Sequence, residues 1–271
     1  MPVIESKLPD VGTTIFTVMS RKAEVHGAIN LSQGFPDFAL PAGLGEALAR
    51  HVAAGHNQYA PMAGVLALRE QIALKIARSY GCRVDPDETV TVVPGATEAI
   101  FCAIMATVGA GDEVILFDPS YDSYEPSVRL AGARAVRIPL LPPAFAIDWQ
   151  RVAGAITSRT RMIVINSPHN PTGSVLGAAD LEHLESLTQQ HGLLVLSDEV
   201  YEHLVYDGAT HHSVLARPAL AERAFAVFSF GKTYHATGWK IGYCVAPPAL
   251  TREFRRVHQF VTFVAVTPIQ H

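Results

Sequence analysis

The sequence has few charged residues and no long hydrophobic run. Charged side chains make up 17% of its 271 residues, apolar side chains make up 49%, and the net charge is −4. This composition excludes a disordered chain, and the weak negative charge gives no electrostatic reason to expect nucleic acid or an anionic membrane as a partner. No apolar stretch approaches the roughly 20 residues that cross a bilayer. We therefore expect a folded globular protein.

Cysteine is scarce, and the features of an export signal are absent. Cys82, Cys102 and Cys244 are far apart and show no paired spacing, so we expect small core side chains and no disulfide. Residues 1–12 lack the charged head and apolar run of a signal peptide. His211 and His212 are adjacent, with no cysteine or carboxylate spacing that would suit a metal, and we expect exposed loop residues. These features predict a cytoplasmic protein without a metal site.

Helical and strand patterns alternate from about Pro41 onward, which indicates an α/β layer architecture. Residues 1–40 are rich in turns and are expected to form an arm or small-domain segment, and residues 41–271 are expected to form one large domain. Several strands are continuously apolar, as expected when helices cover both faces of a sheet. The expected strands are 89–93, 113–117, 134–140, 161–165, 193–196, 224–228 and 241–246. The expected helices are 64–79, 96–108, 149–156 and 178–190.

A lysine follows one of the apolar strands directly. The segment Ser229-Phe230-Gly231-Lys232-Thr233 comes after the strand 224–228. A lysine beside small and hydroxyl residues at a strand end can lie in a cleft, where partial burial lowers its pKa and leaves a nucleophilic amine. Because most lysines are solvated surface charges, this segment alone indicates chemistry only weakly.

A carboxylate follows another buried strand. Asp198 and Tyr201 belong to the segment Ser197-Asp198-Glu199-Val200-Tyr201, and open α/β sheets bind ligands at the carboxyl ends of their strands. An aspartate there can pair with a protonated pyridine nitrogen, and a tyrosine can bond a phenolic oxygen of the same ring. Asp198 could equally cap a following helix.

Three further strand ends carry suitable groups. Asn170 lies in the rigid turn Asn166-Ser167-Pro168-His169-Asn170-Pro171-Thr172-Gly173 and could present its amide to the same crevice. The junction Pro94-Gly95-Ala96-Thr97-Glu98 offers backbone N–H groups and a hydroxyl that suit a phosphate, although an ordinary helix cap would look the same. Tyr121 could stack on a flat ring or simply pack in the core.

Taken in order, these segments resemble the class I and II aminotransferases, which are pyridoxal-phosphate enzymes of the aspartate aminotransferase fold type. Within that family the chain looks closest to the methionine and kynurenine–glutamine aminotransferases. The resemblance extends over essentially the whole chain, and it implies a three-layer α/β/α fold with a mostly parallel sheet. The motifs that carry it are Asn30 to Asp37, Gln58-Tyr59, Ser167 to Gly173, Ser197 to Tyr201, and Ser229 to Gly242.

The resemblance implies roles at the reacting end of pyridoxal 5'-phosphate. Lys232 would carry the cofactor as a Schiff base and act as general base, and Asp198 would bind the pyridine nitrogen. Tyr201 and Asn170 would bond the ring hydroxyl. Gly34 would line the substrate side together with Asn170.

The resemblance also implies how the rest of the cofactor is held. Tyr121 would stack on the ring. Tyr59 would reach the phosphate in a partner subunit, which implies a homodimer. The phosphate of the same subunit would be held by Gly95, Ala96, Thr97, Ser229 and Lys240.

The chain departs from the family pattern in two places. Many relatives have arginine where this chain has Lys240, which supplies charge as a point donor; the methionine-like branch commonly has lysine there. The family normally continues for more than a hundred residues past His271 and supplies an arginine that binds the substrate carboxylate. We therefore expect a truncated chain that lacks the C-terminal small domain.

The implied reaction moves an amino group from an amino acid, with a preference for methionine, aromatic or other large apolar side chains, to a 2-oxo acid. The same residues could serve a β-lyase that acts on cysteine S-conjugates, because fold and cofactor do not fix the reaction. A truncated remnant that binds cofactor without turnover is a third reading. The role of His235, close to Lys232 in sequence, stays open.

Overall fold

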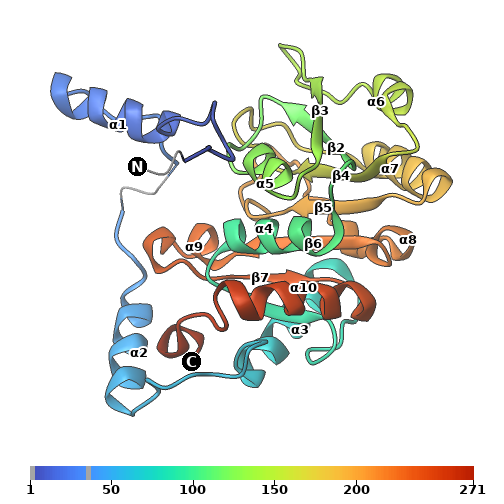
Figure 1. Cartoon of the computed structure of the whole chain (residues 1–271). Helices are drawn as coiled ribbons and strands as arrows, with labels where there is room; N and C mark the ends of the chain where they lie inside the picture. The colour runs from blue at the N-terminus through green and yellow to red at the C-terminus, as the bar shows by residue number, and fades with distance from the viewer. Residues whose placement is uncertain (1–3, 35–37) are drawn as a thin grey trace.

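The computed structural model describes residues 4–34 and 38–271, and a seven-stranded sheet forms its centre (Figure 1). The strand order is β1-β7-β6-β5-β4-β2-β3. β7 is antiparallel to both of its neighbours, whereas the other adjacent strands are parallel. The seven predicted strands and the mostly parallel sheet are thus confirmed. The strands are β1 (Val90–Val93), β2 (Glu113–Asp118), β3 (Arg134–Pro139), β4 (Thr160–Asn166), β5 (Leu194–Asp198), β6 (Ala224–Ser229) and β7 (Gly242–Val245).

Helices connect the strands and lie on both faces of the sheet. None of the helices in the described ranges is long and apolar enough to cross a membrane. The α-helices are α1 (Ile15–His26), α2 (Ala42–Ala53), α3 (Leu66–Tyr80), α4 (Ala96–Thr107), α5 (Tyr124–Leu130), α6 (Trp149–Ala155), α7 (Ala178–His191), α8 (Pro218–Ala221), α9 (Phe230–Thr233) and α10 (Pro248–Val261). Short 3₁₀ turns are η1 (Val214–Ala216), η2 (Thr237–Trp239) and η3 (Thr267–Gln270).

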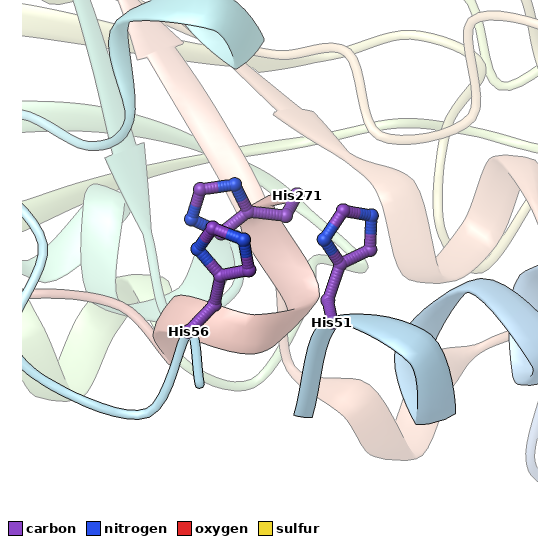
Figure 2. Close-up of side chains that lie close together, drawn as sticks. All are labelled: His51, His56 and His271. Atoms are coloured by element: carbon purple, nitrogen blue, oxygen red, sulfur yellow. The ribbon is translucent and has the colours of Figure 1, made fainter. Parts of the chain in front are cut away.

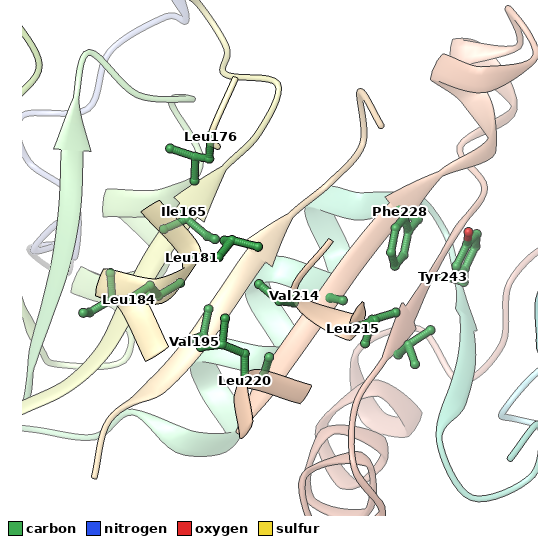
Figure 3. Close-up of a cluster of buried hydrophobic side chains, with 14 of the residues drawn as sticks. Ile165, Leu176, Leu181, Leu184, Val195, Val214, Leu215, Leu220, Phe228 and Tyr243 are labelled. Atoms are coloured by element: carbon green, nitrogen blue, oxygen red, sulfur yellow. The ribbon is translucent and has the colours of Figure 1, made fainter. Parts of the chain in front are cut away.

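Two hydrophobic cores, one on each face of the sheet, hold the layers together. On one face α3, α6 and α7 bury side chains such as Ile76, Val152 and Leu184. Figure 3 shows Leu184 within this cluster. On the other face α4, α5 and α10 bury Ile100, Val128 and Phe254. Each fully buried side chain of this size contributes about 1.5–3 kcal/mol. The fold is the predicted three-layer arrangement, in which the free thiols of Cys102 and Cys244 are buried and that of Cys82 is partly buried.

The helix α1 is an element that the sequence analysis missed. Its ends carry ordinary signals: the Thr14 side chain accepts a hydrogen bond from the Thr17 N–H, and Gly27 adopts the left-handed conformation at φ 58°. The helix has no buried residue, and Ile15 and Val25 are largely exposed. Ile15, Val18 and Met19 have the i, i+3, i+4 spacing of an apolar helix face, but none of them is buried within the described residues.

Candidate active site

The carboxyl ends of three neighbouring strands carry polar side chains. Asn166 ends β4, Asp198 ends β5 and Ser229 ends β6. Asn166 and Asp198 are register partners, and the Asn166 amide donates a hydrogen bond of 2.8 Å to the backbone carbonyl of Asp198. The Asn166 Oδ1 in turn accepts from the Asn170 N–H at 2.7 Å, which fixes the start of the predicted turn. This edge of a parallel sheet is where α/β proteins bind ligands.

A cavity of about 460 Å³ opens at this edge. Lys232 and Asp198 both line it, so the amine and the carboxylate face one space, as the sequence hypothesis required. Phe16, Val200 and Ile241 add apolar surface that the sequence analysis did not assign. The predicted site residues that line the cavity are Gly34, Gly95, Ala96, Thr97, Tyr121, Asn170, Asp198, Tyr201, Ser229, Lys232 and Lys240.

Asp198 is a buried carboxylate with few compensating partners. It is 3% exposed, and its oxygens accept hydrogen bonds from the Tyr124 hydroxyl at 2.6 Å and from the Val200 N–H at 3.3 Å. Within the described residues no cationic side chain forms an ion pair with it. Burial raises the pKa of Asp198 to about 6, although these two hydrogen bonds lower it. A cation bound in the cavity would therefore be attracted to an uncompensated charge.

Lys232 lies in the first turn of α9, directly after the end of β6. The Ser229 hydroxyl accepts from the Lys232 N–H at 3.4 Å, and this cap orients the turn. The Lys232 Nζ donates to the Gly34 carbonyl at 2.9 Å and lies 5.3 Å from the centre of the Tyr201 ring. Burial lowers the pKa of Lys232, and the nearby Lys240 lowers it further, whereas Asp198 opposes the change. The amine is thereby made a better nucleophile.

The amino end of α4 offers a cradle for an anion. The helix begins at Ala96, after Gly95 with φ 87°, so its first N–H groups lie at the cavity. A side-chain carbon at Gly95 would lie 3.3 Å from the Lys240 Nζ, which shows how closely this ammonium approaches the helix end. Helix amino ends and cations both attract phosphate. The Thr97 and Tyr121 hydroxyls lie 3.2 Å apart beside this cradle.

The chain matches known proteins over nearly its whole length. Residues 26–271 match the family model for aminotransferase class I and II. The methionine aminotransferase of Escherichia coli is 56% identical over 266 residues, which are 98% of this chain and 69% of that protein. The chain belongs to the class I and II aminotransferases.

Solved structures agree with this assignment. A crystal structure of the E. coli protein identified as a methionine aminotransferase superposes with a TM-score of 0.96 at 55% identity, and covers 100% of this chain and 70% of that one. The N-succinyldiaminopimelate aminotransferase of Mycobacterium tuberculosis gives a TM-score of 0.95 at 43% identity, with 99% and 70% covered. Human kynurenine–oxoglutarate transaminase 1 is 38% identical over 92% of this chain and 62% of its own length. The protein is therefore a pyridoxal-phosphate-dependent aminotransferase, related to the methionine and kynurenine enzymes as expected.

Tyr59 is the one predicted site residue of this aminotransferase that does not line the cavity. The residue is 82% exposed, and its ring packs edge-on against that of Phe263 with the ring centres 5.4 Å apart. Exposure leaves the ring accessible to another subunit, so its predicted role across a dimer contact stays a prediction. Residues 35–37 of the predicted Asn30 to Asp37 motif lie outside the described residues.

Two polar residues that support the aminotransferase site were also missed in the sequence, and one prediction was wrong. Tyr124 and Asn166 support Asp198, but a helical tyrosine and a strand-end asparagine carry no motif that reveals this. His211 is not an exposed loop residue: its side chain is 5% exposed and its Nε2 lies 2.8 Å from the Glu199 carboxylate. The reason is that Glu199, itself 1% exposed, requires buried polar partners.

Proposed function

We propose that this aminotransferase transfers the amino group of methionine, or of another large apolar amino acid, to a 2-oxo acid. The observation that carries the proposal is the shared cavity of Lys232 and Asp198 beside the amino end of α4. The similarity to a methionine aminotransferase supports the choice of amino acid. Pyridoxal 5'-phosphate, when bound, supplies an aldehyde that condenses with amines and a ring that accepts an electron pair.

The residues of the cavity fit this cofactor. Its phosphate would be held by the backbone N–H groups of Ala96 and Thr97, the Ser229 hydroxyl and the Lys240 ammonium. Its ring nitrogen would pair with Asp198, whose charge has no cationic partner in the described chain. The positive charge of the ring nitrogen would offset the desolvation that raises the pKa of Asp198. The carboxylate would in turn keep the nitrogen protonated.

The remaining cavity residues orient the ring. Tyr121 offers its face for stacking, and Tyr201 and Asn170 carry donors that suit the ring hydroxyl. Burial raises the pKa of Tyr201 to about 12, so its hydroxyl stays protonated and can donate. A negative oxygen on the ring would be stabilised by that donor.

Lys232 is the group that moves the proton. Its Nζ would act as the base that removes the proton from the α-carbon of the amino acid, and it would hold that proton within the cavity for its return. A lowered pKa leaves more of this amine unprotonated at neutral pH and therefore able to act as a base. The hydrogen bond of 2.9 Å from Nζ to the Gly34 carbonyl holds the amine on the proposed substrate side of the cavity.

The apolar side of the cavity suits a large side chain. Phe16 comes from α1 and lines the cavity together with Tyr121, Val200 and Ile241. None of these groups carries a charge, so the carboxylate of an acidic substrate would lose its hydration there without a partner. The surface favours methionine or an aromatic residue over aspartate.

The test is a transamination assay with purified protein loaded with cofactor. We expect oxo-acid formation from methionine with a kcat/KM at least about tenfold above that with aspartate, a difference of 1.4 kcal/mol. Pyruvate release from a cysteine S-conjugate is measured in parallel and should be the slower reaction. Faster turnover of aspartate, or cofactor binding without any transamination, would contradict the proposal.

We further propose that two copies form the active assembly, with Tyr59 donating to the phosphate in the partner. Tyr59 is 82% exposed, which supports this role because no described residue of its own subunit buries it. Sedimentation should give a dimer, and Tyr59→Phe should weaken cofactor binding without changing the mass. A monomer that turns over at full rate would contradict this assignment.

A further inference from the structure

Three imidazole rings meet outside the active-site cavity (Figure 2). His51 lies in the last turn of α2, His56 in the segment that follows, and His271 directly after η3. One ring nitrogen of each lies within 4.8 Å of the other two. The ring centres of His56 and His271 are 3.8 Å apart, and the other two separations are 5.2 and 5.4 Å.

The nitrogens of these rings have no other protein partner in the described ranges. None of the three side chains takes part in a hydrogen bond or an ion pair there. A neutral imidazole with a free lone pair is the form that binds a metal.

We propose that His51, His56 and His271 bind one divalent late transition-metal ion, such as Zn²⁺ or Co²⁺. Imidazole suits this class of ion, whereas Mg²⁺ and Ca²⁺ require oxygen ligands that the cluster lacks. In a tetrahedral site with Zn–N bonds of about 2.0–2.1 Å, the ligand nitrogens lie about 3.3 Å apart. Side-chain rotations at the surface close the gap from the present separation, and water completes the coordination.

A metal ion here would join two segments that are distant in sequence. α2 and the loop after it already meet the segment around η3, because the Ala60 N–H donates to Thr267 Oγ1 at 3.1 Å and the Val65 N–H donates to Gln270 Oε1 at 2.8 Å. Tyr59 lies in this same loop. The ion would therefore hold the loop against η3 and stabilise the folded state by mass action.

No metal site was predicted from the sequence, because His271 is widely separated from the other two histidines along the chain. His51 and His56 are five residues apart, without the spacing of a known motif, and His271 lies at the far end of the chain. Only the packing of α2 against η3 brings the three together. The proposed site is independent of the aminotransferase cavity, which none of these histidines lines.

The test uses the cofactor-loaded protein after treatment with a chelator. Co²⁺ is titrated in, its ligand-field absorption is recorded at wavelengths longer than the cofactor bands, and Zn²⁺ is then added to displace it. We expect one Co²⁺ per chain, displaced by one Zn²⁺, and a thermal midpoint that rises with Zn²⁺. His51→Ala and His56→Ala should each weaken binding at least about tenfold and abolish that rise.

The matched controls are His183→Ala and His191→Ala, which remove exposed histidines of α7 and should bind metal as the parent does. Thermal unfolding without metal shows whether the variants remain folded, and His51→Gln serves as a milder replacement. No stoichiometric Co²⁺ binding by the parent protein would overturn the proposal. Equal binding by the parent and by the folded His51→Gln and His56→Ala variants would overturn it as well, since the ion would then lie elsewhere.

Discussion

Two buried carboxylates, Glu113 and Asp198, lie at opposite ends of the parallel strands: Glu113 at the amino ends and Asp198 at the carboxyl ends. They differ in their hydrogen-bond partners and in the direction of their pKa shifts. Glu113 begins β2, and its side chain accepts hydrogen bonds from Arg134 at 2.6 Å and from Arg159 at 2.7 Å. Asp198 ends β5 and receives one hydroxyl and one backbone N–H. Hydrogen bonds from Arg134, Thr157 and Arg159 lower the pKa of Glu113 to about 2, whereas burial raises the pKa of Asp198 to about 6.

The difference in partners indicates that the charge of Glu113 is structural, whereas that of Asp198 is available to a ligand. The charge of Glu113 is neutralised by its own chain, so nothing further needs to bind there. The charge of Asp198 is buried at a cavity and lacks a cation in the described chain, which costs folding free energy until one arrives. We interpret Asp198 as poised for the protonated ring nitrogen of pyridoxal 5'-phosphate.

The largest expected effect follows from removing the ligand-binding charge. Asp198→Asn should lower kcat for methionine by about a hundredfold or more, because losing one partner of a buried charged pair costs about 2–5 kcal/mol. Steady-state assays at saturating cofactor measure it. Glu113→Gln is the control and should stay within about twofold of the parent. Equal losses in both variants would remove the distinction between the two carboxylates.

The next effect is the pH dependence of stability without cofactor. The pKa of Asp198 is raised from 3.8 to about 6 in the folded state, so its ionisation destabilises the fold as the pH rises through that window. Asp198→Asn should therefore become more stable than the parent from about pH 4 to pH 6, by up to about 3 kcal/mol. Urea unfolding at a series of pH values measures the difference. A variant less stable than the parent at neutral pH would contradict the account.

A smaller effect of opposite sign is expected at the structural charge. Glu113→Gln should lower the free energy of unfolding by about 1–2 kcal/mol at neutral pH, because two largely exposed arginines lose an ionised partner. The pKa of Glu113 is lowered from 4.5 to about 2, so this stabilisation is present above about pH 4.5 and is lost as the pH falls toward 2. Urea unfolding of both proteins over that range should show the gap closing. A difference in unfolding free energy that grows as the pH falls would contradict this role of Glu113.

The smallest effect tests the Tyr124 hydroxyl, which is the side-chain donor to Asp198 among the described residues. Tyr124→Phe removes the hydrogen bond of 2.6 Å and should lower turnover about fivefold, equivalent to roughly 1 kcal/mol. Tyr80→Phe, at a tyrosine bonded to Glu202, removes a hydroxyl outside the cavity and should leave turnover unchanged. If Tyr80→Phe has the larger effect on turnover, Tyr124 does not support the site.

The strands and the strand-end residues were predictable because each depends on local sequence. Buried parallel strands are continuous apolar runs. Asp198 ends one such strand, and Lys232 and Asn170 lie in the short segments that follow two others. Since carboxyl ends of parallel strands share one edge, a correct strand assignment already places these side chains together. This is why one cavity contains them.

The features that were missed depend on neighbours distant in sequence. Tyr124 donates a hydrogen bond to Asp198, which is 74 residues away in sequence. His211 is buried against the carboxylate of Glu199. The histidine cluster combines residues from both ends of the chain. None of these contacts leaves a pattern in the local sequence.

The most direct measurement locates the covalent bond to the cofactor. Protein loaded with pyridoxal 5'-phosphate is reduced with borohydride, digested, and mapped by mass spectrometry, with Lys240→Ala and Lys232→Ala treated alike. Our account predicts a label on Lys232 in the parent and in Lys240→Ala, and no label in Lys232→Ala. A label on Lys240, or one that persists in Lys232→Ala, would contradict it.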